Sequence, residues 1–168
     1  MNYTSASANK LIKLLEDKKA YLLHTEANNS TYVLAEDEKN DIPEFDFVEF
    51  NRNLDEINHK IKTLKHALNV FNSTTVLPLG ITIDEALVEM AQLNNKLSRL
   101  DCMRKAKTKT RLSGYSAARR DIAEYQYLNY EPMDVQKVYE DNLNRVQQIQ
   151  LALDKANQTI EFDIDVTE

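Results

Sequence analysis

Residues 47–71 decide the fold of this chain, and they read FVEFNRNLDEINHKIKTLKHALNVF. Apolar residues recur here at alternating intervals of three and four, which is the heptad period of coiled-coil helices. These apolar positions are Phe47, Phe50, Leu54, Ile57, Ile61, Leu64, Leu68 and Phe71. A helix with this pattern has one narrow apolar seam and needs partner helices to cover it. The sequence therefore predicts a helical bundle.

The composition excludes several classes of protein. A chain of 168 residues with 42% hydrophobic and 29% charged residues is typical of one globular domain. Its two glycines, Gly80 and Gly114, are too few for a Rossmann fingerprint or a P-loop. The sequence has no run of about 18 apolar residues and no signal peptide, so we expect a cytoplasmic protein that does not contact membranes.

Local signals predict three more helices. The first starts after Ser5 or Ser7, either of which could cap it. Another starts at Thr82, because Thr82 and Glu85 form a capping box. The last opens near Asp134, where a carboxylate favours the helix dipole. The seam predicted for this last helix contains Val135, Tyr139, Leu143, Val146, Gln150, Leu153 and Asn157.

Alternating apolar and polar residues predict short strands. The clearest strands cover residues 122–130 and 160–166. Since the last helix leads away from the first strand and the chain must return, we predict that these two strands pair. Residues 31–47 could form a β-hairpin, although their end overlaps the start of the heptad helix.

These elements predict a mainly α fold of the α+β type. We expect an antiparallel helical bundle with long, coiled-coil-like helices and a small antiparallel β-sheet. Short connections favour antiparallel neighbours among the helices. We assign the whole chain, residues 1–168, to a single helical domain.

Four segments also resemble a known family. The segments INHKIKTLKHALNVFNSTT, GITIDEALVEMAQLNNKL, DIAEYQYLNYEPMDVQKVYED and QLALDKANQTIEFDID are similar to the septicolysin-like family of small bacterial helical proteins. The likeness covers roughly residues 10–166, and segment 31–47 departs from the helical linker of shorter members. The resemblance implies a helical bundle with coiled-coil character that self-associates, and its shared residues are not catalytic motifs. The family name implies a lytic protein.

A basic segment follows the third helix and covers residues 99–120, with Asp101 as its only acid. One interpretation is a surface that binds nucleic acid or another polyanion, with cations on phosphates and Tyr115 stacking on a base. The alternative is a solvated loop, or one that docks on the acidic segment 36–49. The candidate binding residues are Arg104, Lys105, Lys107, Lys109, Arg111, Tyr115, Arg119 and Arg120.

Motifs for catalysis or for metal binding are missing from the sequence. His59 and His66 are seven residues apart, or about 10 Å along a helix, which is too far for one chain to hold a metal ion between them. Cys102 is the only cysteine, and we predict a buried or half-buried structural thiol near the end of a helix. We therefore expect no metal, no cofactor and no catalytic residue, and we favour a protein without enzymatic activity.

Tyrosines and asparagines admit two interpretations each. The tyrosines of the C-terminal third could line a pocket or an interface, but packing of a strand face on helices is the preferred interpretation. They are Tyr115, Tyr125, Tyr127, Tyr130 and Tyr139. Asn69, Asn72 and Asn157 are expected to form caps and turns, with a polar functional cluster as the alternative.

The leading functional expectation is a non-enzymatic, homo-oligomeric scaffold or interaction protein, with a second copy as its partner. The seam would supply interface or packing residues, namely Ile57, Ile61, Leu64, Leu68 and Phe71. The alternative is anion or nucleic-acid binding through residues 99–120, although the net charge of −6 opposes binding by the whole surface. The family name suggests membrane lysis. The sequence argues against it, because no amphipathic segment combines a basic face with bulky apolar anchors.

Overall fold

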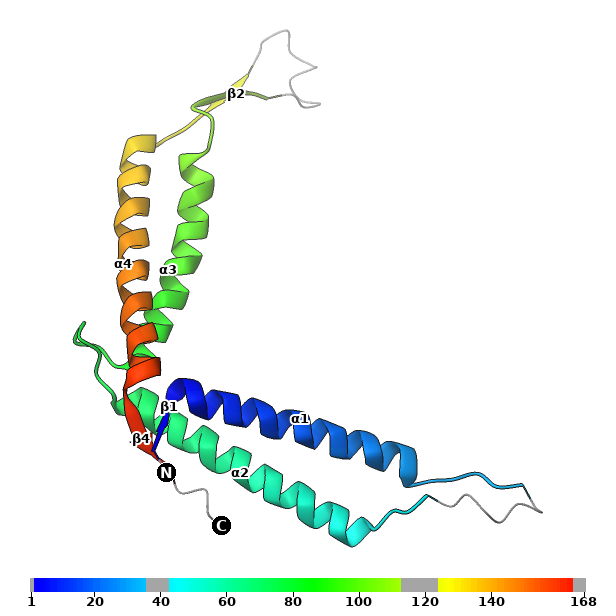
Figure 1. The fold of residues 1–168 in the computed structure, drawn as a ribbon. Coiled ribbons are helices and arrows are strands. Elements are labelled where there is room, and N and C mark those ends of the chain that lie inside the picture. Colours follow the sequence, from blue (N-terminus) through cyan, green and yellow to red (C-terminus); the bar gives the residue numbers. More distant parts are fainter. Residues whose placement is uncertain (1, 36–42, 113–123, 165–168) are drawn as a thin grey trace. The chain divides into compact units, whose positions relative to one another are not determined.

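The computed structural model describes residues 2–35, 43–112 and 124–164. The chain forms two compact units where the sequence predicts a single domain. Unit 1 comprises Met1–Leu77 and Asp154–Glu168, and unit 2 comprises Pro78–Leu153. Long helices and a few short antiparallel strands make up both units (Figure 1), which confirms the mainly α fold.

Unit 1 contains the helices α1 (Ser5–Asn29) and α2 (Phe47–Thr74). Helix α1 is capped by Thr4 and not by Ser5 or Ser7, the two predicted caps, and the Thr4 hydroxyl accepts a hydrogen bond from the Ser7 amide at 3.2 Å. Helix α2 is capped by Asp46, whose Oδ1 accepts hydrogen bonds from the amides of Val48 and Glu49. Both helices therefore begin where a side chain satisfies free amides.

Two contacts between side chains show that α1 and α2 run antiparallel. Lys19 Nζ donates to Asn58 Oδ1 at 2.8 Å, and Lys65 Nζ donates to Glu16 Oε1 at 2.7 Å. From the first contact to the second, the residue number falls from 19 to 16 in α1 and rises from 58 to 65 in α2, as it must in antiparallel helices. The seams of the two helices meet in a core made of Ala8, Ile12, Leu64, Leu68 and Ile164.

A two-stranded sheet closes one end of unit 1. Strand β1 (Asn2–Thr4) pairs antiparallel with β4 (Glu161–Asp163). Phe162, in the middle of β4, stacks on Phe71 of α2 with the ring centroids 4.4 Å apart. Ile164 follows and is 2% exposed, so this sheet covers the end of the α1–α2 core.

Unit 2 contains α3 (Ile83–Arg104) and most of α4 (Pro132–Thr159). The predicted capping box is confirmed, because Glu85 N donates to Thr82 Oγ1 and Thr82 N donates to Glu85 Oε2. Buried residues on each helix are separated by 3, 4, 7 or 11 residues, which keeps them on one helical face. They are Ile83, Ala86, Leu97 and Leu100 in α3 and Val135, Asn142, Ile149, Leu153 and Ala156 in α4.

An ion pair joins these two helices. Arg145 binds Glu89 through two bonds, Nε to Oε1 at 2.7 Å and Nη2 to Oε2 at 2.9 Å. The hydrogen bonds between these two side chains lower the pKa of the Glu89 carboxyl and raise the pKa of the Arg145 guanidinium. This bidentate geometry favours one alignment of α3 with α4.

A second two-stranded sheet belongs to unit 2. Strand β2 (Lys109–Arg111) pairs antiparallel with β3 (Tyr125–Tyr127). The ladder continues at both ends, where Leu112 N donates to Glu124 O and Leu128 N donates to Thr108 O. We call this sheet the ribbon.

The predicted pairing of strands 122–130 and 160–166 is wrong. Strands β3 and β4 lie within these segments, but β3 pairs with β2 and β4 pairs with β1. The reason is that α4, which separates them, has 28 residues and spans about 42 Å. Only residues 128–131 and Ile160 connect these short strands to α4, so the strands cannot reach each other across its length.

The predicted hairpin over residues 31–47 is also corrected. Residues 31–35 and 43–46 form no strand, and α2 begins at Phe47, while residues 36–42 lie outside the described part of the chain. The seam predicted for α4 is shifted too, because Gln150 is exposed and Asn142 is buried. The amide of Asn142 donates to the Val138 carbonyl, so this buried polar group is satisfied within its own helix.

Among the helices of the described residues, we find none with an apolar stretch long enough to cross a membrane.

Candidate functional site

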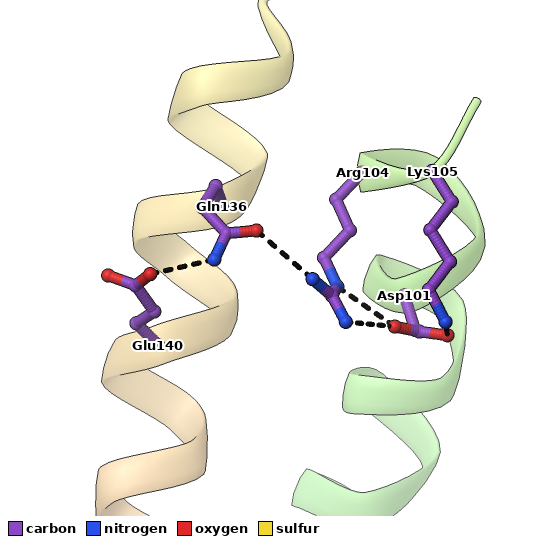
Figure 2. A network of polar contacts seen from close by, with 5 residues as sticks. All are labelled: Asp101, Arg104, Lys105, Gln136 and Glu140. Carbon is purple, nitrogen blue, oxygen red and sulfur yellow. Dashed lines mark hydrogen bonds and ion pairs between the residues drawn. The ribbon is translucent and has the colours of Figure 1, made fainter. Parts of the chain in front are cut away.

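The predicted basic segment begins at the end of α3, where two of its cations are already paired. Arg104 Nε and Lys105 Nζ donate to the two carboxylate oxygens of Asp101 at 2.8 and 2.6 Å (Figure 2). Hydrogen bonds from Lys105 and then Arg104 lower the pKa of the Asp101 carboxyl. Nearby, the Tyr130 hydroxyl donates to the Met103 carbonyl at 2.9 Å. The end of α3 is thus held by its own contacts.

Arg104 also bridges α3 to α4. Its guanidinium lies 4.3 Å from the centroid of the Tyr139 ring, and its Nη1 donates to Gln136 Oε1 at 3.4 Å. Gln136 in turn donates to Glu140, so the polar chain continues along α4 (Figure 2). These contacts place Arg104 in the packing of unit 2 and leave it little freedom to bind a ligand.

The ribbon carries the remaining cations beside tyrosines. Lys109 lies opposite Tyr127 and Arg111 lies opposite Tyr125 in the antiparallel register. Side chains of directly opposed residues share a face of the sheet, and so do those two residues apart along a strand. We call the face with Lys109, Arg111, Tyr125 and Tyr127 the ribbon face.

The aromatic part of the ribbon face is open to solvent. Tyr125 is 41% exposed and Tyr127 is 62% exposed, with ring centroids 6.5 Å apart. Lys109 Nζ lies 4.1 Å from the Tyr125 centroid and 5.4 Å from the Tyr127 centroid. A cation over the face of an exposed ring is held weakly, by about 0.5–1 kcal/mol. A ligand that offers Lys109 a negative charge can therefore draw it away.

Positive charge dominates the ribbon and the residues that lead into it. Lys107, Lys109 and Arg111 are all exposed and have no carboxylate partner among the described residues, whereas Glu124 is the one acid in residues 105–112 and 124–128. Three free cations on a short stretch can contact an anionic polymer.

The ribbon face partly departs from the prediction. The sequence favours packing for the tyrosines of this region, but Tyr125 and Tyr127 are exposed. Their association with Lys109 was not predicted, although the alternation in KTR and YQY could have indicated two strands of one hairpin. Tyr115, Arg119 and Arg120, predicted to belong to the same site, lie outside the described residues.

Other candidate groups are dispersed. Cys102 is exposed, so the prediction of a buried or half-buried thiol is wrong. His59 and His66 are exposed on α2, and His24 contacts only Asn28 among the hydrogen bonds of the described residues. Three or more His, Cys, Asp or Glu side chains positioned for a metal ion do not occur in residues 2–35, 43–112 and 124–164.

Two of the singled-out asparagines line a groove between α1 and α2. Asn69 and Asn72 lie within α2, whose cap is Thr75, so they do not end the helix as expected. The groove holds about 680 Å³. It is lined by Asn9, Ile12, Lys13, Glu16, Asp17, Lys65, Leu68, Asn69 and Asn72. Its two lysines are balanced by two carboxylates, so it lacks the excess of cations found on the ribbon.

The seam residues of α2 are used within one chain. Ile57, Leu64, Leu68 and Phe71 are each at most 7% exposed, and Ile61 is half-buried. Phe47, the first seam residue, is 61% exposed. Apart from Phe47, these seam side chains pack unit 1 and offer little apolar surface to another molecule.

Comparison with known proteins shows a likeness to a solved structure. No family model matches the chain, and no curated protein matches it. The crystal structure of a functionally unknown conserved protein from Corynebacterium diphtheriae is similar, with a TM-score of 0.62 and 17% identity. The match covers 97% of this chain and 100% of the other. The two proteins share a fold, and this identity supports no statement about activity.

Proposed function

We propose that this chain is an interaction protein that binds polyanions through the ribbon. The observation that supports the proposal is the group of three exposed cations, Lys107, Lys109 and Arg111, without carboxylate partners among the described residues. Arg104 and Lys105, at the base of the ribbon, are paired with Asp101 and are left out of the proposed contact.

The net charge of −6 does not rule out such a site. At physiological ionic strength the Debye length is about 8 Å, so charges elsewhere in the chain are largely screened at an exposed ribbon. The local balance of charge then decides, and on the ribbon it is positive. The same screening limits long-range attraction, so we expect modest affinity that depends on salt.

Binding of labelled heparin, a polyanion without bases, tests the proposal across a series of salt concentrations. The logarithm of the binding constant should fall linearly with that of the salt concentration, because each contacted anion releases counterions. Arg111→Ala should reduce this slope by about a third, since it removes one of three contacts. Lys62→Ala, which removes an exposed lysine of α2, is the matched control and should leave the slope unchanged. Absence of binding, or equal effects of the two variants, would overturn the proposal.

A homo-oligomeric helical scaffold is the second candidate. A specific observation favours it, because Leu14 and Tyr21 lie seven residues apart on one face of α1 and are 64% and 70% exposed. Self-association through this face agrees with what the family resemblance implies. Light scattering on a sizing column should then show an oligomer that Leu14→Gln with Tyr21→Gln dissociates. A monomer at all protein concentrations would remove this candidate.

A further inference from the structure

We infer that the polyanion bound by the ribbon is a single-stranded nucleic acid whose bases stack on Tyr125 and Tyr127. The inference rests on the proposed function and adds the class of ligand to it. Cations alone would suit any anionic polymer. The ribbon face also places two exposed aromatic rings directly beside these cations.

The arrangement matches what an unpaired strand offers. A single strand alternates phosphates with bases whose flat faces are free, and proteins bind it with cations along the backbone and aromatic rings under successive bases. Lys109 and Arg111 lie on β2, and the two tyrosines lie on β3. The backbone of the ligand would therefore follow β2 while its bases lie over β3.

Lys109 makes the two kinds of contact compatible. In the free protein its ammonium lies over the Tyr125 ring, close to Tyr127. A phosphate attracts this ammonium more strongly than an exposed ring does. When Lys109 moves to the phosphate, the ring face becomes available to a base. The Tyr125 ring therefore loses its contact with the Lys109 ammonium and gains a stacked base in its place.

Duplex nucleic acid fits this face less well. Base pairs of a duplex hide their flat faces in the stack, so exposed tyrosines gain no stacking from them. A two-stranded ribbon can enter the major groove of DNA, where it reads base edges by hydrogen bonds. The ribbon face has aromatic rings beside its cations, and such rings favour contact with the flat faces of unpaired bases over contact with base edges in a groove.

Binding measurements with four labelled probes test the inference: oligo-dT, oligo-U, a DNA duplex of equal length and heparin. The double variant Tyr125→Leu, Tyr127→Leu keeps apolar bulk and removes the aromatic faces, while Tyr125→Phe, Tyr127→Phe keeps them. The Leu variant should weaken binding of the single strands at least tenfold, since each stacked base contributes a factor of about 5 or more. It should leave heparin binding unchanged, and the Phe variant should bind like the wild type. Tyr32→Leu, at an exposed tyrosine of unit 1, is the control.

The outcomes separate this inference from the proposed function. Heparin binding without preference for single strands, preferred binding of the duplex, or equal losses of heparin and oligonucleotide in the Leu variant would overturn the inference and leave polyanion binding intact. Failure to bind any probe would overturn both. Because the chain has no tryptophan, tyrosine emission is a second readout, which oligo-dT or oligo-U should quench and heparin should not. Comparison of the oligo-dT and oligo-U arms tells whether DNA or RNA is preferred.

Discussion

Truncation of Leu64 tests whether the heptad seam of α2 is filled within a single chain. Leu64 is 0% exposed and lies in the core of unit 1 between α1 and α2. Leu64→Ala removes three side-chain carbon atoms from this core. The same substitution at Leu151, which is 71% exposed on α4, removes the same atoms from the surface.

The expected losses of stability differ several-fold. For a fully buried leucine, the lost transfer free energy and the remaining cavity together lower the free energy of unfolding by about 3 kcal/mol. With a urea m-value of about 2 kcal/mol/M, the midpoint of urea unfolding should fall by about 1.5 M. Leu151→Ala should change the free energy of unfolding by less than about 0.5 kcal/mol.

Urea unfolding followed by far-UV circular dichroism at several protein concentrations measures both effects. If the seam is filled within one chain, the loss for Leu64→Ala is the same at every concentration. Two results would refute this reasoning: equal losses for Leu64→Ala and Leu151→Ala, or a loss that varies with protein concentration. The second result would mean that another chain fills the seam.

Three further perturbations test contacts within unit 2. Since Arg145 lowers the pKa of Glu89, their pair stabilises the fold above the unfolded-state pKa of about 4.3 and loses this effect as the pH falls through the lower folded-state pKa. Glu89→Gln should therefore reduce the urea midpoint at pH 7 and leave it nearly unchanged at pH 3; equal reductions at both would contradict the assignment. Thr82→Ala removes the cap of α3 and should cost about 1 kcal/mol of unfolding free energy, and a thermal melt without a shift would argue against the capping box. Arg104→Lys keeps the charge but loses the planar contact with Tyr139 and should cost about 1 kcal/mol in a urea titration, whereas a neutral result would show that charge alone matters.

The sequence was most informative about elements whose signals are local. The heptad pattern predicts α2, and the Thr82–Glu85 pair predicts the first residue of α3. Both signals depend on residues within one or two helical turns. Asn142 shows the limit of such patterns, because a polar residue at a seam position can satisfy itself through the Val138 carbonyl.

Partners far apart in the sequence could not be predicted in this way. Alternation marks β3 and β4 as strands but does not say which strand each one pairs with. The length of α4 excludes their pairing, and that length becomes clear only when the helix is known to continue from Pro132 to Thr159. The ribbon face escaped prediction for the same reason, since the register of β2 with β3 brings Lys109 beside Tyr125.

The pairing of β1 with β4 has a consequence for the growing polypeptide. β1 precedes and β4 follows all four helices in the sequence, and Asn2 lies opposite Asp163, 161 positions further along. Ile164 lies 90 residues beyond Thr74, where α2 ends, so at about 5–20 residues per second a ribosome needs roughly 5–18 s to reach it. Helices α1 and α2 must wait through that interval with Phe71 and part of their core uncovered. The α1–α2 pair is thus accessible to chaperones and proteases until all of unit 2 and then β4 have been made.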